Sequence, residues 1–414
     1  MLGKHICKIP WAGFSNNPDG TVKPCCIFKE NIKKTDGSDY YVQNDDVKDI
    51  FHSDYMNNLR QEFLDGNQPS PCETCWIDES NGYKSKREIY NEIYTSYDVD
   101  CETNKPTVDY PIDYQLIISN ACNLKCRSCG SSHSTQWQKE INTLPDNVPG
   151  ANDYVFKYDM PYGQVGGRDS VFINEIEKWC SKVKRLEVVG GEPFYIEKWK
   201  TIFNFLMDNG YAKDIDLSMS TNATIFNEEL LIKMSNHFKF LGIGLSIDGM
   251  GKTYDYLRKN GSWDEVKSNI LRFYQFYRNK TSEKDYNGHS LSMNYTYTIS
   301  WLNAYDLPEF HSFVKNNTPE FRIWNNIVHY PAHMSIDMLP NDEKQRIQDK
   351  WDMYDWGVYT DDIKSVLSFM WSKEYTDEEI KEQFLNFKFF DYIRQENTYN
   401  IIKDNHPNLL KYLE

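Results

Sequence analysis

The chain has 414 residues, of which 40% are hydrophobic and 26% are charged. This length allows one large α/β domain with a smaller module, and the composition is ordinary for a soluble globular protein. The formal net charge of −15 disfavours non-specific binding to nucleic acid and to anionic membrane surfaces, because both attract basic proteins.

The sequence contains no pattern that predicts a membrane span or a secretory signal. No apolar run approaches the ~20 residues that a membrane helix needs. The opening MLGKHICKIPWAGF lacks the long apolar core of a signal peptide. We therefore expect a cytoplasmic protein without a membrane partner. In such a reducing compartment, the ten cysteines favour metal ligation over disulfides.

Residues 1–100 contain five of the ten cysteines and several turn signals, such as NNPDG and KTDGSD, with little sustained periodicity. A segment of this kind is difficult to stabilise by core burial alone. We therefore expect a small module that is stabilised by a bound metal.

The middle of the chain alternates strand-like runs with helical stretches. The strand-like runs cover 114–119, 186–189, 215–220, 240–247, 292–301 and 321–328. The helical stretches cover 171–183, 194–209, 227–237, 263–279 and 304–315. Six strands separated by helices predict parallel βαβ units. Six units are too few for a closed eight-stranded barrel, so we expect an α/β fold with a partial (β/α)6 TIM-like barrel or an open sheet, and ligands at the carboxyl ends of its strands.

The last part of the chain has apolar residues at helical spacing, as in TDEEIKEQFLNFKFFDYIRQ. This pattern predicts a helical cap or lid. The predicted domains are therefore a cysteine-rich module over 1–100, a barrel over 111–340 and a helical cap over 341–414.

The loop after the first predicted strand holds Cys122, Cys126 and Cys129 in the spacing C-x3-C-x2-C. Closely spaced thiolates are ligands for zinc or for iron–sulfur centres. Structural sites usually close with four ligands. A [4Fe–4S] cluster held by three thiolates keeps one iron open for a small ligand, which is a catalytic arrangement. A structural zinc knuckle and free thiols are the alternatives.

This motif resembles the signature of the radical S-adenosylmethionine (SAM) superfamily. The resemblance implies that the amino and carboxylate groups of SAM chelate the open iron. One electron from the cluster then cleaves SAM into methionine and a 5′-deoxyadenosyl radical, which abstracts a hydrogen atom from a substrate. Many members have an aromatic residue before the third cysteine, where this chain has Ser128.

Later strand ends carry further matches to the superfamily. Gly190, Gly191 and Glu192 resemble the motif that binds the methionine amino group. Glycines allow close approach of the backbone, and a carboxylate accepts hydrogen bonds from an ammonium group. Turn chemistry and surface ion pairs are the alternatives. The other implied cofactor residues are Ser220 and Asn222 (followed by Ala223 where the family has glycine), Ser246 and Asp248 for ribose hydroxyls, and Arg258 for the carboxylate.

The N-terminal cysteines resemble the auxiliary-cluster pattern C-x9–15-G-x4-C…C of SPASM and twitch modules. Such modules usually follow the barrel, whereas this one precedes it. Four ligands fit the one-cluster twitch form, with Cys26 and Cys101 as spare thiols. A structural four-cysteine zinc site is the alternative. The residues that would close a second [4Fe–4S] cluster are Cys7, Cys25, Cys72 and Cys75, with Gly20 at the glycine position.

These motifs predict a radical SAM enzyme, an oxidoreductase or a transferase, that receives its electron from a reducing partner such as flavodoxin or ferredoxin. A peptide is the first candidate substrate, because SPASM and twitch relatives often modify peptides; a small metabolite such as a carbohydrate is the second. Tyr297 and His329 are candidate general bases, although strand alternation also favours core packing for them. The alternatives are a non-catalytic zinc or iron–sulfur protein and a member that binds SAM without cleaving it.

Overall fold

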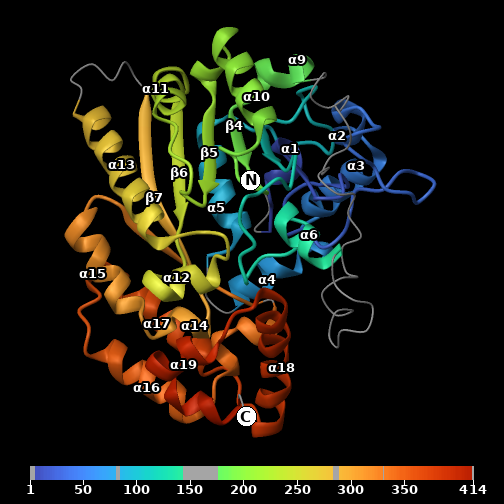
Figure 1. Cartoon of the computed structure of the whole chain (residues 1–414). Coiled ribbons are helices and arrows are strands. Elements are labelled where there is room, and N and C mark those ends of the chain that lie inside the picture. Colours follow the sequence, from blue (N-terminus) through green and yellow to red (C-terminus); the bar gives the residue numbers. More distant parts are fainter. Residues whose placement is uncertain (1–4, 81–83, 143–175, 283–288, 330, 413–414) are drawn as a thin grey trace.

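The computed structural model describes residues 5–80, 84–142, 176–282, 289–329 and 331–412. One sheet organises this part of the chain, with the strand order β2-β1-β3-β4-β5-β6-β7-β8 (Figure 1). β1 and β2 are antiparallel, and the other neighbouring pairs are parallel. The strands are β1 Gly13–Asn16, β2 Val22–Lys23, β3 Asp113–Leu116, β4 Arg185–Val188, β5 Asp216–Thr221, β6 Phe240–Ser246, β7 Ser290–Ile299 and β8 Arg322–Ile327.

The predicted α/β class with a partial barrel is confirmed, because β3 to β8 coincide with the six predicted strands and the sheet ends at β2 and β8 without closing in the described residues. The predicted helices also form, apart from 171–175, which lie outside the described residues. They are α9 Ile176–Trp179, α10 Glu197–Asp208, α11 Glu228–His237, α13 Trp263–Thr281 and α15 Leu307–Asn317. Among the described residues of this part of the chain, three helices were not predicted, namely α6 Thr135–Asn142, α12 Gly251–Leu257 and α14 Trp301–Ala304, which begins at the last residue of the predicted strand 292–301.

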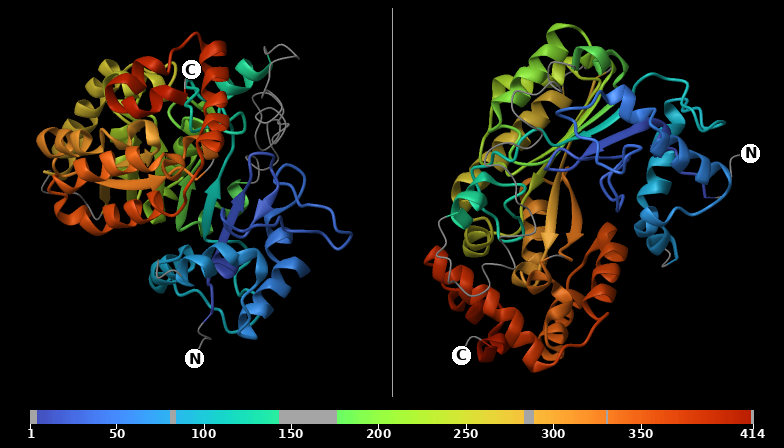
Figure 2. Two further views of the ribbon diagram at one scale, coloured as in Figure 1. Left: turned by 90° about the horizontal axis from the view of Figure 1, so that it is seen from below. Right: turned by 90° about the vertical axis from the view of Figure 1, so that its right-hand side faces the viewer.

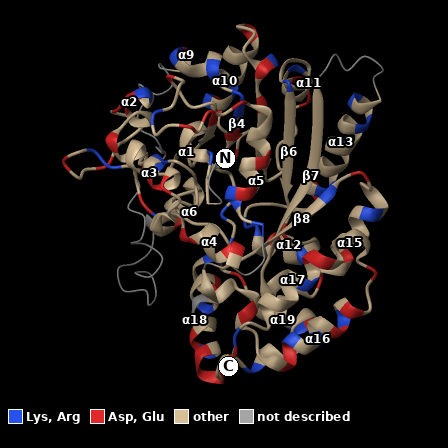
Figure 3. Cartoon of the chain, turned by 180° about the vertical axis from the view of Figure 1, so that it is seen from behind, with Lys and Arg blue, Asp and Glu red and all other residues tan. Residues whose placement is uncertain are grey.

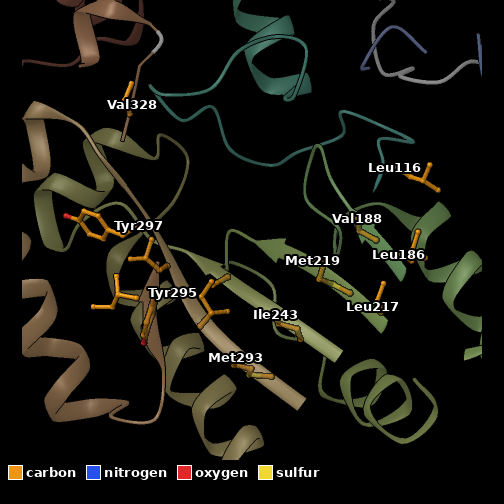
Figure 4. Close-up of a cluster of buried hydrophobic side chains, with 14 of the residues drawn as sticks. Leu116, Leu186, Val188, Leu217, Met219, Ile243, Met293, Tyr295, Tyr297 and Val328 are labelled. Atoms are coloured by element: carbon orange, nitrogen blue, oxygen red, sulfur yellow. The ribbon is translucent and has the colours of Figure 1, made fainter. Parts of the chain in front are cut away.

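The two faces of the sheet differ in chemistry. One face carries large apolar side chains, such as Leu217, Ile243 and Tyr295, which are buried in the core (Figure 4). The residues between them, such as Ser218 and Asn294, point to the other face because successive side chains of a strand alternate. β6 and β7 contain no charged residue (Figure 3). At β6 and β7, the inner face of the curved sheet is therefore lined by small, neutral groups.

The first hundred residues form several helices that the low periodicity of their sequence did not indicate. Ser85 and Glu88 form a capping box, a helix-start signal that is visible in the sequence. The buried side chains of Trp11, Phe28 and Phe63 belong to the same core cluster as the barrel. Apolar burial therefore contributes to the stability of this module, and the expected metal is not its sole support. Its helices are α1 Ile9–Ala12, α2 Val47–Phe51, α3 Asp54–Leu64, α4 Glu73–Ser80 and α5 Lys86–Ile93.

The C-terminal residues form the predicted helices and lie at one end of the barrel (Figures 1 and 2). Trp301, which directly follows β7 and Ser300, packs against Phe384 and Phe387 of this cap. Within the described residues, no helix combines the length and the apolar character that crossing a membrane requires. The cap helices are α16 Asn341–Asp352, α17 Thr360–Met370, α18 Asp377–Arg394 and α19 Tyr399–Asn405.

His311 is a buried histidine on α15 with a consequence for the pH dependence of folding. Its ring packs edge-on against Trp356 and Tyr359, and its Nε2 has no hydrogen-bond partner in the part of the chain that the structure describes. Burial lowers the pKa of His311 to about 4, whereas the unfolded side chain has a pKa of about 6.5. Between these values the unfolded chain binds one more proton than the folded chain. The stability contribution that is complete above the unfolded pKa is therefore lost as the pH falls towards 4.

We expect His311→Gln to reduce the slope of the free energy of unfolding against pH by up to ~1.4 kcal/mol per pH unit across this window. Urea unfolding of the wild type and the variant, at several pH values between about 4 and 7, measures the two slopes. Identical slopes would contradict the assignment, whatever the variant does to stability at neutral pH.

Candidate active site

A cavity of about 740 Å³ lies within the curve of the sheet, at the carboxyl ends of the strands. Its walls come from the loop after β3, from the turns that follow β4, β5 and β6, and from the inner face of β7. The structure therefore brings together every predicted cluster and cofactor residue of the barrel, namely Cys122, Cys126, Cys129, Gly190, Gly191, Glu192, Ser220, Asn222, Ser246, Asp248 and Arg258.

Hydrogen bonds hold the loop with the three cysteines against α6. The hydroxyl of Thr135 donates to the carbonyl oxygen of Cys122 at 3.2 Å. The indole N–H of Trp137 donates to the carbonyl oxygen of Cys126 at 2.6 Å. The backbone of the loop is thus fixed by side chains that follow it in the sequence, so its position does not depend on a bound metal alone.

Nitrogen donors face two of the three sulfur atoms. The backbone N–H of Leu124 and the side-chain amide of Asn222 lie 3.4 Å and 3.9 Å from the Cys122 sulfur. The Arg258 guanidinium lies 3.9 Å from the Cys126 sulfur. Burial raises the pKa of all three thiols, to about 12 for Cys129. These donors therefore favour the thiolate form, which metal ligation requires and which burial alone opposes.

Gly190 and Gly191 bring the end of β4 against the loop with the three cysteines. Both have positive φ, 81° and 59°. A Cβ atom on Gly191 would lie 2.4 Å from the carbonyl oxygen of Ala121, and the next residue, Glu192, donates its backbone N–H to that same oxygen at 2.9 Å. Only glycine permits this combination of dihedral angle and close approach. The turn therefore sets the position of the loop.

The Glu192 carboxylate is buried and joins the ends of β4 and β5. It accepts hydrogen bonds from the Thr221 hydroxyl and the Asn222 backbone N–H, both at 2.7 Å, and from the Phe194 backbone N–H at 3.2 Å. Burial raises the pKa of Glu192, and these three donors oppose the increase. After Asn222, Ala223 has a φ of 59°, the left-handed conformation that suits the glycine of the family motif.

Asp248 and Arg258, for which the sequence implies separate contacts with SAM, are paired with each other. Their side chains are buried and 2.7 Å apart, and Asp248 also accepts from the backbone N–H of Thr298 at 3.0 Å. The Nε of Arg258 has no hydrogen-bond partner among the described residues. Arg258 therefore lies beside Cys126 in a fixed orientation and keeps one unused donor.

The structure also brings together the four cysteines of the N-terminal module that match the auxiliary-cluster pattern. Burial raises the pKa of Cys7, and the three other thiols raise it further. Burial likewise raises the pKa of Cys25 to about 11. Cys101 lies near Arg60 and has no thiol among its electrostatic neighbours, so it is separate from the four. The four that lie together are Cys7, Cys25, Cys72 and Cys75.

Family models match both halves of this arrangement. The model of the radical SAM superfamily matches residues 116–282, and the SPASM model, an iron–sulfur cluster-binding domain, matches residues 7–76. Residues 116–282 therefore form a radical SAM domain, and a SPASM domain precedes it. The matched ranges confirm that the auxiliary module precedes the radical SAM domain. The cofactors are accordingly a [4Fe–4S] cluster and SAM, with auxiliary iron–sulfur binding in the SPASM domain.

Solved structures with some likeness to this radical SAM protein include anSMEcpe with bound AdoMet, at 17% identity and a TM-score of 0.36. That match covers 63% of this chain and 66% of the anSMEcpe chain, slightly less than two thirds of its length. Streptococcus suis SuiB bound to S-adenosylmethionine is 12% identical, with coverage of 91% of this chain and 76% of that chain and a TM-score of 0.36. None of the curated proteins matches the chain.

The donor sets fit iron–sulfur clusters in their chemistry. Both are composed of thiols, and nitrogen donors face two of the three sulfur atoms in the barrel. In the described part of the chain, no three His, Cys, Asp or Glu side chains converge on the position of a single metal ion. A [4Fe–4S] cluster is bound through one thiolate on each of several irons, so its cysteines surround a volume rather than a point.

Gly191→Ala should cost at least about 2 kcal/mol of stability, because it combines an unfavourable positive φ with the overlap against Ala121. Gly210→Ala is the matched control, since Gly210 has a φ of 75° but open space around its missing Cβ. Urea unfolding and iron content after reconstitution compare the two variants. We expect only Gly191→Ala to lower the iron content. Equal iron content in the two variants would show that this turn does not affect binding of the cluster.

The cavity contains polar residues that the sequence analysis did not select. Four of them occupy alternate positions of β7, from Ser292 to Thr298. The glycines of β6 leave space in front of these side chains, since a Cβ on Gly244 would lie 2.9 Å from the Thr296 hydroxyl. In the sequence, the alternation of small polar residues along SLSMNYTYTI could have predicted this polar face of the strand. Other residues in the cavity are Gln115, Glu187, Ser218, Ser292, Asn294, Thr296, Thr298 and His133.

Neither candidate general base lines the cavity. Tyr297 points to the apolar face of the sheet, is fully buried, and donates to the carbonyl oxygen of Asn303 at 3.3 Å. His329 is exposed and packs against Phe369 of the cap. The interpretation of these two residues as bases is therefore wrong, because the register of β7 turns Thr296 and Thr298 inward instead of Tyr297.

Proposed function

We propose that this radical SAM protein is an enzyme that reductively cleaves SAM and abstracts hydrogen from a polar substrate, in the first place a peptide. The observation that carries the proposal is the cavity of about 740 Å³, because both the three cysteines and the polar side chains of the inner face of the sheet line it. When bound, the cluster and SAM supply a 5′-deoxyadenosyl radical. The chain binds and orients the reactants and excludes water.

We assign the catalytic cluster to the three cysteines of the barrel and the SAM contacts to the turns around them. Ser246 and Ser220 line the cavity beside the cysteines and suit ribose hydroxyls or a carboxylate. Arg258 keeps a free Nε donor near Cys126. Glu192 holds the end of β5 through Thr221 and Asn222, so it supports the SAM site even where it does not contact SAM.

The auxiliary module supports an oxidative reaction. β1 pairs with β3, which leads directly into the loop of three cysteines. Lys86 lies 3.0 Å from the sulfur of Cys26, next to Cys25, and Glu187 in the cavity is among its electrostatic neighbours. A cluster held by the four thiols of this module would accept the second electron of a substrate oxidation, after a hydrogen atom has passed to the SAM-derived radical, with the remaining proton released to solvent. The contacts of β1 and Lys86 link the module to the cavity and support this role.

Glu187 is the carboxylate that is most available to a substrate. The other two carboxylates in the cavity, Glu192 and Asp248, are satisfied by backbone donors, a hydroxyl and Arg258. Glu187 makes no hydrogen bond or salt bridge with the described residues. Around it lie amide and hydroxyl groups that suit the hydrogen-bonding groups of a peptide. We therefore assign to Glu187 the role of accepting a hydrogen bond from the substrate.

A peptide is also supported by the SPASM match and by the open edge of the sheet. Trp324 on β8 is paired with Thr296 of β7, so both side chains lie on the inner face. Trp324 is 57% exposed at this edge, where an aromatic ring can contact an extended chain that enters the cavity.

Deuterium transfer tests the proposal with mixtures, so the substrate need not be identified first. The reconstituted protein is incubated with dithionite, SAM and either a peptide or a carbohydrate fraction from cells grown in deuterated medium, and mass spectrometry measures deuterium in 5′-deoxyadenosine. We expect deuterium from the peptide fraction. Transfer from the carbohydrate fraction alone would reject the peptide. Absence of 5′-deoxyadenosine from a protein with an intact cluster would favour a non-catalytic protein.

Glu187→Gln should reduce deuterium transfer about tenfold or more, since a hydrogen bond to a charged acceptor contributes ~1.5–3 kcal/mol. Total 5′-deoxyadenosine should stay within about twofold of the wild type, because cleavage without transfer continues. Glu197→Gln, on the outer helix α10, is the matched control and should behave as the wild type. Unchanged transfer in Glu187→Gln would remove this residue from substrate binding.

A further inference from the structure

The C-terminal cap contacts the cysteine loop of the barrel through Arg127, which lies between Cys126 and Cys129. The Arg127 side chain is 3% exposed. Its Nη2 donates to the Asp391 carboxylate at 2.7 Å and to the Glu396 carboxylate at 2.6 Å. Asp391 belongs to α18, and Glu396 follows the end of this helix. A charged group in the middle of the cysteine loop is thus bound by two carboxylates from the cap.

Further contacts fix this ion pair on several sides. The Arg127 guanidinium lies 3.8 Å from the centre of the Tyr256 ring, and the Tyr256 hydroxyl donates to Asp391 at 2.9 Å. Lys259 lies 3.0 Å from Glu396, so the two carboxylates face two cations. Arg127 therefore joins three parts of the fold, namely the cysteine loop, α12 with the turn after it, and the cap.

A second contact lies beside the first. Arg394, the last residue of α18, forms a buried ion pair with Glu140 of α6 at 2.8 Å. Its guanidinium lies 4.5 Å from the centre of the Trp137 ring, and the indole of Trp137 donates to the carbonyl oxygen of Cys126. The cap thus contacts Cys126 in two ways, through its chain neighbour Arg127 and through Trp137, whose indole donates to the Cys126 carbonyl oxygen.

The contact has a small apolar core of its own. Trp137 packs with Phe389 and Phe390 of α18 in a cluster separate from the main core, and Cys129 packs against it. Because this core is small, the buried charges decide the orientation of the cap on the loop. Residues about 260 positions away in the sequence therefore cover part of Cys129.

We propose that Arg127 is a positioning residue for the catalytic cluster and that the cap forms the outer wall of the cluster site. The proposal rests on the assignment of the cluster to the three cysteines under the proposed function. A loop with three ligands must hold its sulfurs at fixed spacing, and charge-assisted hydrogen bonds to groups around the ligands provide that restraint. Removal of Arg127 leaves the largely buried Asp391 carboxylate without a cation and leaves Glu396 with Lys259 alone, so the contact between the loop and the cap is weakened.

The test compares Arg127→Met, Arg127→Lys and Asp391→Asn with the wild type, each purified and reconstituted without oxygen. The readouts are the electron paramagnetic resonance spectrum of the reduced cluster with and without SAM, and the rate at which a ferrous chelator removes iron. We expect Arg127→Met to lose iron about tenfold faster, because groups that hold metal ligands typically contribute 10–100-fold to metal affinity. Its SAM-dependent spectrum should become heterogeneous.

Two comparisons separate positioning from a general loss of stability. Arg346→Met is the matched control, because it breaks a cap ion pair, with Glu343 at 2.7 Å, that does not reach the cysteine loop. It should lower the unfolding temperature without changing the spectrum or the iron-release rate. Arg127→Lys should restore most of the lost cluster retention, and Asp391→Asn should cost less than Arg127→Met, because Glu396 remains.

The proposal would be overturned if Arg127→Lys and Asp391→Asn both had the spectrum and the iron-release rate of the wild type. This holds whether Arg127→Met behaves as the wild type or is insoluble. A failure of the proposed function is distinguishable from this outcome. If the wild type forms no 5′-deoxyadenosine but iron release still depends on Arg127, the positioning role stands and the catalytic assignment falls. If 5′-deoxyadenosine forms and iron release is independent of Arg127, the reverse holds.

Discussion

Cys126→Ala should abolish the formation of 5′-deoxyadenosine from SAM. Cys126 is the central cysteine of the loop, and its sulfur lies 3.9 Å from Arg258, in the wall of the cavity where the SAM residues meet. Loss of one of three thiolates leaves the cluster with two ligands and no defined open iron. Reductive cleavage needs that open iron, so the activity should disappear rather than decrease.

The measurement is chromatography of 5′-deoxyadenosine after anaerobic reconstitution and reduction. Cys180→Ala is the matched control, since Cys180 is also buried but does not line the cavity. It should retain cleavage. Formation of 5′-deoxyadenosine by Cys126→Ala at the wild-type rate would reject the assignment of the catalytic cluster.

Cys72→Ala should leave cleavage of SAM intact and stop productive turnover. Cys72 belongs to the group of four thiols in the N-terminal module and does not line the cavity. Without it the auxiliary cluster lacks a ligand, and the second electron of an oxidation has no acceptor. We expect iron to fall from about eight to about four per chain, with matching sulfide, and deuterated substrate to be activated without release of oxidised product.

Cys101→Ala is the matched control for this variant, because Cys101 is a buried thiol of the same part of the chain without a thiol neighbour. Iron that stays near eight per chain in Cys72→Ala would show that Cys72 is not a ligand. If the wild type contains about four irons and one zinc per chain, the N-terminal module has a structural role. If Cys72→Ala gives the full product yield, the auxiliary cluster takes no part in the reaction.

Local spacing and periodicity carried much of the prediction. The six strands β3 to β8 follow from apolar runs of period two, which depend only on neighbours in sequence. The C-x3-C-x2-C spacing and the Gly190-Gly191-Glu192 turn are likewise local, because they bring chemistry to the end of a single strand. Such patterns can be read from a short segment without knowledge of the rest of the fold.

The sequence did not predict which face of β7 lines the cavity. Polar and aromatic residues alternate along this strand, and either set is compatible with a cavity on one side. The choice depends on register with β6, since a shift by one residue exchanges the two faces. The structure places Thr296 and Thr298 in the cavity and Tyr297 under the helices.

The sequence by itself determined the cofactor chemistry, the fold class and the strands of the barrel, because thiol spacing and apolar periodicity are properties of short segments. Only the tertiary structure decided that Asp248 pairs with Arg258, that β1 extends the barrel sheet, and that Arg127 binds Asp391, 264 residues further along the chain. Buried charges must find partners wherever the fold brings them. Which carboxylate meets which guanidinium is therefore set by long-range packing, and no short pattern records it.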